Sequence, residues 1–280
     1  MSTTSSWVVI TGCSSGIGLH VANGLRAQGY RVLPCCRTAA QRERLLESFE
    51  NAVAFDLANE AQVERGASEI LALTGGQIFA LFNNAAYGQP GAVEDLSRAV
   101  LEQQFAGNFF GTHQLTRALL PALMAQRSAR IIQHSSVLGF VGMGFRGAYN
   151  ASKYALEGLT DTLRQELKGT SVKVSLIQPG PVLSEFRSNA LKALRANIDC
   201  EHSRHAKSYQ QSLQRLEAQG PAVPFTVGPE AVLKRVLHAL QSRSPKVRYP
   251  VTAPTYVLGG LKRVLPNKWF DAVVKAASKA

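Results

Sequence analysis

The sequence predicts an α/β fold in which helices cover both faces of a doubly wound parallel sheet. Short β-branched and aromatic runs alternate with helical stretches along the chain, as in successive βαβ units. A glycine-rich turn follows the first of these runs, and polar residues follow several later ones. Ligands bind at the carboxyl ends of the strands in such sheets, so these polar residues are expected to share one edge.

The expected strands are buried apolar runs bounded by turn residues. They cover residues 7–11, 31–36, 53–56, 78–83, 130–135, 172–178 and 246–249. Helices are expected between them. The first runs from the glycine turn to about Gln28, with Gly29 as its C-cap, and longer ones cover residues 101–120 and 149–167.

Two apolar segments follow later strands. Residues 184–225 carry apolar side chains at helical spacing between prolines, which predicts one or two amphipathic helices. Such a segment fits a mobile lid over the edge of the sheet, and ordinary amphipathic packing is a nearly equal alternative. Residues 137–145 are also apolar and supply a second wall. The two segments together favour an apolar pocket.

The first βα turn reads Thr-Gly-Cys-Ser-Ser-Gly-Ile-Gly over residues 11–18. A strand, a glycine-rich turn and a helix N-terminus form a site for phosphate, because backbone N–H groups and the helix dipole favour negative charge. The alternative is that the glycines only serve the geometry of a tight turn. The position of the turn in the first βα unit favours phosphate.

Tyr149 and Lys153 are four residues apart, so they share one face of the helix expected there. An ammonium held near a phenol favours the phenolate and lowers the phenol pKa toward the range of an acid/base catalyst. Ser136 and Asn108 lie upstream. By itself, the tyrosine–lysine pair is a weak signal, because such a pair is usually a half-buried ring beside a solvated lysine tip.

Taken together, these motifs resemble those of the short-chain dehydrogenase/reductase superfamily in its single-domain form, over residues 7–249. The glycine turn matches, and so does the run from Tyr149 to Lys153 with Ser136 thirteen positions before the tyrosine. The sequence looks most similar to bacterial members of the branch that resembles retinol and 17β-hydroxysteroid dehydrogenases.

The resemblance implies hydride transfer between a nicotinamide and a carbonyl carbon. Tyr149 would exchange a proton with the carbonyl oxygen, and Ser136 would hold that oxygen. Lys153 would lower the tyrosine pKa and bond the nicotinamide ribose, and Asn108 would anchor a water. The residues expected to bind the cofactor are Gly12, Ser14, Ser15, Gly16, Ile17, Gly18, Arg37, Asp56, Leu57, Asn83, Ala85, Tyr149, Lys153, Pro179, Gly180, Val182 and Ser184.

The resemblance also implies a division of the chain. A Rossmann-like catalytic domain is expected over residues 1–250, with the lid at about 184–225, followed by a helical tail over 251–280. Two positions depart from the family pattern. Ala86 stands where the family usually has glycine, which would be strained if that position needs a positive φ. Ser184 replaces the usual threonine and keeps its hydroxyl.

The end of the second strand decides the expected cofactor. An acidic residue there would accept a hydrogen bond from the ribose 2′-hydroxyl, and residues 32–38 contain none. Arg37 instead offers a planar fork suited to a 2′-phosphate, with Arg42 and Arg44 close behind. The alternative is that these arginines only solvate an exposed helix. We therefore expect NADP(H) rather than NAD(H).

The expected activity is NADP-dependent reduction of an apolar aldehyde or ketone, or oxidation of the corresponding alcohol. One alternative is an NAD-dependent alcohol, retinol or steroid dehydrogenase. Another is a regulator that binds the dinucleotide without catalysis. All four catalytic positions are filled, which disfavours the regulator.

The composition fits one α/β domain, because 280 residues with 45% hydrophobic side chains can build a large core. No run of eighteen apolar residues occurs, and residues 1–6 lack a basic residue, which argues against a membrane span and a secretory signal. The four cysteines form no C-x-x-C pair, so we expect a cytoplasmic protein. Cys200, His202 and His205 lack a fourth ligand, so no metal site is expected.

The net charge is +12, and residues 242–280 hold eight Lys or Arg and one Asp among apolar and aromatic residues. Such a basic amphipathic segment can lie on an anionic membrane surface as a peripheral contact. The favoured alternative is helical packing on the domain or a partner subunit, because Gly259, Gly260 and Pro266 interrupt the segment. No nucleic-acid module accompanies the charge, so no nucleic-acid partner is expected. The expected partners are a small apolar carbonyl or alcohol substrate and a second copy in a homo-oligomer.

Overall fold

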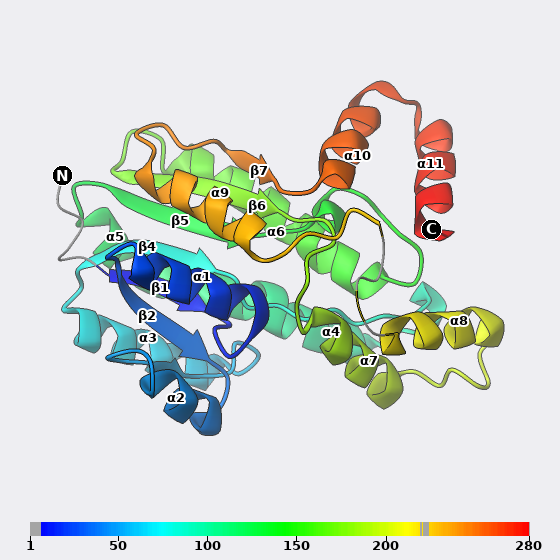
Figure 1. The fold of residues 1–280 in the computed structure, drawn as a ribbon, viewed down its shortest axis with the longest axis horizontal. Helices are drawn as coiled ribbons and strands as arrows, with labels where there is room; N and C mark the ends of the chain where they lie inside the picture. Colours follow the sequence, from blue (N-terminus) through cyan, green and yellow to red (C-terminus); the bar gives the residue numbers. More distant parts are fainter. Residues whose placement is uncertain (1–6, 219, 221–223, 280) are drawn as a thin grey trace.

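The computed structural model describes residues 7–218, 220 and 224–279 (Figure 1). Within this part of the chain, seven strands pair in parallel in the order β3-β2-β1-β4-β5-β6-β7. The strands are β1 (Trp7–Thr11), β2 (Arg31–Cys36), β3 (Val53–Ala54), β4 (Ile78–Asn83), β5 (Ala129–His134), β6 (Val172–Gln178) and β7 (Arg248–Pro250). The strand order reverses between β1 and β4, which confirms the predicted doubly wound sheet.

Helices connect the strands and extend beyond the carboxyl edge of the sheet. The α-helices are α1 (Gly16–Ala27), α2 (Ala39–Leu46), α3 (Glu60–Thr74), α4 (Arg98–Phe105), α5 (Gly111–Met124), α6 (Gly147–Glu166), α7 (Phe186–Asn197), α8 (Ala206–Glu217), α9 (Glu230–Gln241), α10 (Ala253–Val264) and α11 (Asn267–Lys279). Shorter helical turns are η1 (Val93–Asp95), η2 (Ala106–Phe110) and η3 (Val137–Gly139).

The sheet has an apolar core on each face, because successive side chains of a strand point to opposite sides. In β1, Val8 and Ile10 pack with α1, α2 and α9, whereas Trp7 and Val9 pack with α3, α5 and α6. All four side chains are buried. The two-sided core explains why the strand reads as a continuous apolar run rather than an alternating one.

Two helical pairs flank the carboxyl edge of the sheet (Figure 1). The pair α7 and α8 confirms the prediction that residues 184–225 contain amphipathic helices, although residues 219 and 221–223 lie outside the described part of the chain. The pair α10 and α11 forms the C-terminal hairpin. The predictions about the two ends of the chain also concern residues 1–6 and 280, which lie outside the described part of the chain.

Several boundaries differ from the sequence-based expectation for identifiable reasons. The predicted strand 53–56 ends at Ala54, and the backbone N–H of Asp56 donates to Gln62 Oε1 instead of a neighbouring strand. The predicted helix 101–120 is divided by η2, a single π-helical stretch. Gly259 and its neighbour Gly260 lie inside α10 rather than breaking it.

The structure also bears on two expectations that were drawn from the composition. Over the described residues, no helix combines the length and apolarity needed to cross a membrane. All four cysteines are free thiols.

Candidate active site

The glycine turn after β1 packs directly against the segment that follows β4. Gly12 has a φ of +73°, and a Cβ there would lie 2.8 Å from the Cα of Ala85. A Cβ on Gly18 would lie 2.1 Å from the carbonyl oxygen of Gly12. Because both approaches are too close for a side chain, the turn can hold this shape only with glycine at these positions.

Thr11 and Asn84 fix the turn to the neighbouring strand ends. The Thr11 hydroxyl accepts hydrogen bonds from the backbone N–H groups of Asn84 and Ala85, each at 3.0 Å. The Asn84 amide donates to the carbonyl oxygens of Thr11 and Gly12, at 2.9 and 3.3 Å. Its oxygen accepts from Nδ1 of His134, at the end of β5, at 2.8 Å. Three strand ends are therefore joined through one side chain.

Ser136 and Tyr149 meet at the same edge of the sheet. Both side chains are buried, and the Ser136 hydroxyl is close enough to the Tyr149 phenol to favour its ionised form. Ser136 is the second residue after β5 and accepts a hydrogen bond from the backbone N–H of Leu138 at 3.1 Å. Phe186, the first residue of α7, packs edge-on against the Tyr149 ring, with centroids 5.2 Å apart. The first residue of α7 therefore covers one side of the Tyr149 ring.

Lys153 lies one turn after Tyr149 in α6, as the spacing predicts. Its Nζ is 5.7 Å from the centroid of the Tyr149 ring and donates to the backbone carbonyl of His134 at 2.6 Å. Burial lowers the pKa of Lys153 to about 7, although Glu157 opposes this change. Burial, with a smaller contribution from Lys153, lowers the pKa of His134 to about 3, so its imidazole is neutral.

The pKa of Tyr149 differs from the expectation. Burial raises it above its usual value of 10, and the hydrogen bond with Ser136 only partly opposes this rise. The expected lowering by Lys153 is therefore wrong for this structure. The physical reason is that desolvation disfavours the charged form of both groups, so neither stabilises the other's ion effectively.

Asn108 lies in the π-helical stretch between α4 and α5 and is 1% exposed. Its Oδ1 accepts from the backbone N–H of Tyr87 at 3.1 Å, and its Nδ2 donates to the carbonyl of Tyr87 at 2.9 Å. Nδ2 also donates to Ser152 Oγ at 3.3 Å. The side chain thus holds the loop after β4 against α6, beside Lys153. Its predicted role in anchoring a water remains a prediction.

The remaining cofactor-binding candidates lie along the same edge, at the ends of five different strands. Arg37 follows β2 and is exposed, and Asp56 follows β3. Asn83 ends β4 and donates to Thr116 Oγ1 at 2.8 Å. The other candidates are Ser14, Ser15 and Ile17 in the glycine turn or first turn of α1, Leu57 after β3, and Pro179, Gly180, Val182 and Ser184 after β6.

The segment after β6 closes the site opposite the glycine turn. A Cβ on Gly16 would lie 3.2 Å from Cβ of Ser184, so the two walls approach closely. Ala86, where a positive φ would have caused strain, has no positive φ. Among the described non-glycine residues, only Phe145 and Phe225 have one. Alanine is therefore compatible with the backbone at this position.

The apolar wall next to Tyr149 includes the C-terminal hairpin. Val137 and Leu138 of the predicted wall pack with Tyr149 in one buried cluster. Leu258 of α10 and Phe270 of α11 belong to the same cluster. The tail therefore packs on the domain, which is the alternative that the sequence favoured. Its contribution to the wall beside the tyrosine was not predicted.

This geometry agrees with the comparisons with known proteins. A family model described as short chain dehydrogenase matches residues 6–195. The chain belongs to the short-chain dehydrogenase/reductase superfamily. Members of this superfamily are oxidoreductases that use a nicotinamide dinucleotide, so this chain is an oxidoreductase of that class.

Individual relatives cover nearly the whole chain. The uncharacterized oxidoreductase YbbO of Escherichia coli is 44% identical over 96% of this chain and 93% of its own length. Retinol dehydrogenase 8 of Bos taurus is 36% identical over 93% of this chain and 86% of its own length. The crystal structure of a short chain dehydrogenase/reductase from Burkholderia phymatum in complex with NAD has a TM-score of 0.76 and 26% identity, covering 94% of each chain.

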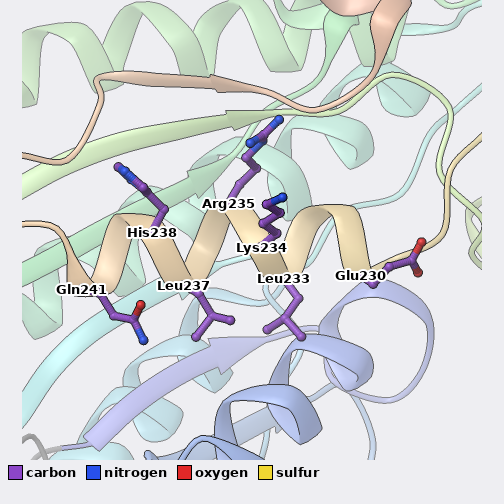
Figure 2. Close-up of a pocket in the computed structure, with 7 residues that line it drawn as sticks. All are labelled: Glu230, Leu233, Lys234, Arg235, Leu237, His238 and Gln241. Carbon is purple, nitrogen blue, oxygen red and sulfur yellow. The ribbon is translucent and has the colours of Figure 1, made fainter.

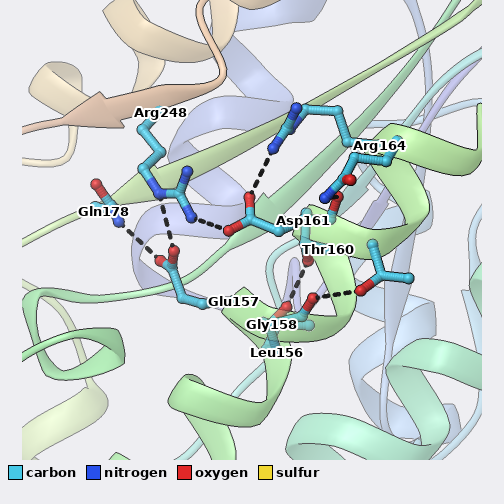
Figure 3. A network of polar contacts seen from close by, with 10 residues as sticks. Leu156, Glu157, Gly158, Thr160, Asp161, Arg164, Gln178 and Arg248 are labelled. Carbon is cyan, nitrogen blue, oxygen red and sulfur yellow. Dashed lines mark hydrogen bonds and ion pairs between the residues drawn. The ribbon is translucent and has the colours of Figure 1, made fainter. Parts of the chain in front are cut away.

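A polar network in this short-chain dehydrogenase/reductase connects the catalytic helix to β6 and β7 (Figure 3). Glu157, one turn after Lys153, accepts from Gln178 Nε2 at 2.8 Å and from Arg248 Nε at 3.2 Å. Arg248 also donates to Asp161 at 2.5 Å. The Glu157 side chain is only 9% exposed. The network was not predicted, because its members lie far apart in the sequence.

His134 is a residue at this edge that sequence reasoning missed, and its hydrogen bond with Asn84 was not predicted either. Both follow or end a strand at the carboxyl edge, so their position next to Asn83 and Ser136 was the available signal. Their hydrogen bond across neighbouring strands depends on the register of the sheet and cannot be read from either segment.

A surface pocket on α9 lies apart from these residues. Figure 2 shows that it is lined by side chains of that helix only: Glu230, Leu233, Lys234, Arg235, Leu237, His238 and Gln241. Leu233 packs against α1, where a Cβ on Gly24 would lie 2.3 Å from its Cδ2. None of the predicted site residues lines this pocket.

The two histidines between α7 and α8 have separate partners. His202 Nδ1 lies 2.9 Å from a carboxylate oxygen of Asp199, and His205 Nε2 lies 3.2 Å from Glu94. In the part of the chain that the structure describes, no three His, Cys, Asp or Glu side chains gather where a metal ion could be held.

Proposed function

We propose that this protein is an NADP(H)-dependent reductase of apolar aldehydes or ketones. The observation that carries the proposal is that the buried side chains of Ser136 and Tyr149 lie together, with the Lys153 amine 5.7 Å from the centre of the Tyr149 ring. This group stands at the edge of the sheet where the glycine turn ends β1. A proton donor and a hydrogen-bond donor therefore converge where a dinucleotide would bind.

The residues present fit a dinucleotide. Because Gly12 and Gly16 lack a Cβ, the backbone of the glycine turn approaches Ala85 and Ser184 closely and stays uncovered by side chains of its own at these positions. The N-terminus of α1 follows that turn, and its N-cap residue Ser15 makes no side-chain cap, so backbone donors remain for a pyrophosphate. These residues, with Asp56, Asn83 and Pro179 at neighbouring strand ends, would hold the cofactor.

When bound, the nicotinamide supplies the hydride. Tyr149 gives its proton to the carbonyl oxygen of the substrate as that oxygen gains negative charge. Ser136 donates a hydrogen bond to the same oxygen and orients it. The raised pKa of Tyr149 keeps it as the neutral phenol, which is the form that donates a proton.

Lys153 is placed to restore the proton. Its pKa of about 7 lets it gain and lose a proton near neutral pH, and its amine lies beside the Tyr149 ring. Asn108 holds the loop containing Tyr87 and bonds Ser152, so it fixes α6 in this position. These assignments extend the roles expected from the sequence.

The walls favour a hydrocarbon substrate. Phe186 from α7 and the cluster that contains Val137, Leu138 and Leu258 surround Tyr149 with apolar side chains. The similarity to a retinol dehydrogenase supports a long apolar substrate. The proposed substrate class is therefore an aldehyde or ketone that carries a hydrocarbon chain or ring.

The catalytic assignment is tested by Tyr149→Phe. The variant keeps the ring and loses the proton, so turnover of NADPH with a panel of apolar aldehydes and ketones should fall by roughly 10²–10⁴-fold. Binding of NADPH, followed by its fluorescence, should stay nearly unchanged. Retained turnover would refute the assignment. Absence of turnover in the wild type on every substrate, with intact NADPH binding, would favour the non-catalytic regulator.

The cofactor assignment is tested by Arg37→Ala. Loss of a charged hydrogen bond to the 2′-phosphate should weaken the binding of NADPH roughly tenfold to a hundredfold and leave the binding of NADH almost unchanged. Arg44→Ala is the matched control, since Arg44 is another exposed arginine farther from the end of β2. Equal losses for both cofactors in Arg37→Ala would support the NAD-dependent alternative.

A further inference from the structure

The end of the C-terminal hairpin combines exposed apolar and basic side chains. We call it the hairpin tip and define it as Arg263, Val264, Pro266, Lys268 and Trp269. Val264 is 75% exposed and Trp269 is 65% exposed, and the other three side chains are also exposed. Figure 1 shows that the turn between α10 and α11 projects from the body of the molecule. We propose that the hairpin tip docks on an anionic lipid bilayer.

The exposure of the tip is not a consequence of loose packing. The inner side of the hairpin contributes Leu258, Phe270 and Val274 to the buried cluster around Tyr149. Lys262 donates to the backbone carbonyl of Phe140, and to the hydroxyl of Tyr154 in α6 at 3.1 Å. The hairpin is therefore anchored on one side, and the tip is what this anchoring leaves in solvent.

The side chains of the tip match the interface of a membrane. Tryptophan prefers the boundary between headgroups and hydrocarbon, because its ring is apolar and its N–H is polar. Val264 and Pro266 add apolar surface beside it. Arg263 and Lys268 flank this surface, and each basic residue near an anionic bilayer strengthens binding by about fivefold. Residues 263–269 contain no acidic side chain.

Charge favours a bilayer over a second copy of the chain. A twofold contact through the tip would place Arg263 and Lys268 of one copy against the same residues of the other, and like charges repel there. The acidic residue in the hairpin sequence, Asp271, stands against five Lys or Arg over residues 253–279. Anionic headgroups supply the negative charge that another copy would not.

The proposed docking goes beyond the proposed function. One consequence of the docking rests on that function. The tip and Tyr149 are joined through the same hairpin, because Leu258 and Phe270 pack in the cluster that contains the tyrosine. If the substrate is an apolar carbonyl compound, docking would bring the apolar wall of the active site to the surface in which that substrate dissolves.

Tryptophan fluorescence provides a direct test on the full-length protein. The chain has two tryptophans, and Trp7 is 3% exposed in the core, so a change in emission reports on Trp269. Phosphatidylcholine vesicles containing phosphatidylglycerol should shift the emission to the blue, and sodium chloride should reverse the shift. Vesicles of phosphatidylcholine only should cause little change. No shift with the anionic vesicles, or equal shifts with both, would overturn the proposal.

Sedimentation of variants with vesicles separates the contribution of the basic side chains of the hairpin tip from that of positive charge elsewhere on the surface. Arg263→Gln with Lys268→Gln should weaken sedimentation with anionic vesicles by about 25-fold. The charge-matched control is Lys168→Gln with Lys173→Gln, two exposed lysines near the amino end of β6, and it should bind as the wild type does. Equal weakening by the control pair would refute a specific role of the tip.

Two further outcomes distinguish the proposals. Tyr149→Phe should bind anionic vesicles like the wild type, so docking can succeed even if the proposed activity fails. Self-association in sedimentation velocity that Trp269→Ala abolishes, together with no binding of the wild type to vesicles, would overturn the proposal in favour of a second copy.

Discussion

Replacing the buried ammonium of Lys153 should stabilise the protein at acidic pH. The folded protein releases the Lys153 proton at about pH 7, whereas an unfolded lysine does so near its usual value of 10.5. Between these values the unfolded chain binds more protons, so the stability of the wild type rises with pH through this window. Lys153→Met has nearly the same shape without the charge and should lose this dependence.

The magnitude follows from the two pKa values. The charge penalty is roughly 4.5 kcal/mol at pH 6 and roughly 2 kcal/mol at pH 9, which is a difference of roughly 2.5 kcal/mol. Lys153→Met also loses the hydrogen bond to His134 and changes the packing, but these effects are the same at both pH values. The difference between the two conditions therefore isolates the charge.

Urea unfolding without added nucleotide measures this effect. The free energy of unfolding of Lys153→Met, relative to the wild type, should be roughly 2.5 kcal/mol more favourable at pH 6 than at pH 9. Lys173→Met, the same substitution at an exposed position in β6, should show no such change. A relative stability of Lys153→Met that is the same at both pH values would refute the reasoning about burial.

Three further perturbations test other parts of the site. Gly18→Ala should destabilise the protein by about 1–3 kcal/mol or more in thermal unfolding and abolish nucleotide binding, because its Cβ would meet a backbone carbonyl at 2.1 Å. Arg248→Met should lower the free energy of unfolding by about 3–5 kcal/mol, since it leaves the buried Glu157 without its cation, and adding Glu157→Gln should restore most of the loss in urea unfolding. Tyr209→Phe removes the 2.6 Å hydrogen bond to Asp95 that anchors α8, so amide exchange in that helix should accelerate, whereas unchanged exchange would argue against the anchor.

The fold and most of the local site were predictable because their signals are local. The spacing of Tyr149 and Lys153 fixes a shared helix face, and the glycines of the first turn mark a strand-to-helix connection. The β-branched runs gave the strands, with errors of one or two residues at their ends. The end of β3 was misplaced because the Gln62 side chain, six residues away, takes the N–H of Asp56.

The contacts between distant segments were not predictable in the same way. The Asn84–His134 bond depends on β1, β4 and β5 lying side by side, and the Glu157–Arg248 pair depends on α6 crossing β7. The interruption of residues 101–120 was also missed. Its periodic apolar pattern continues through the π-helical stretch, and what sets Asn108 apart is its bonding to Tyr87.

The amino-acid sequence by itself determined the layered α/β fold, the family and the residues that lie together at the carboxyl edge of the sheet, because each depends on patterns within a short stretch of chain. Only the tertiary structure decided the electrostatics of those residues. Burial raises the Tyr149 pKa and lowers that of Lys153. Desolvation depends on every segment that packs around a group, so it became visible only when the lid, the strand ends and the C-terminal hairpin were in place.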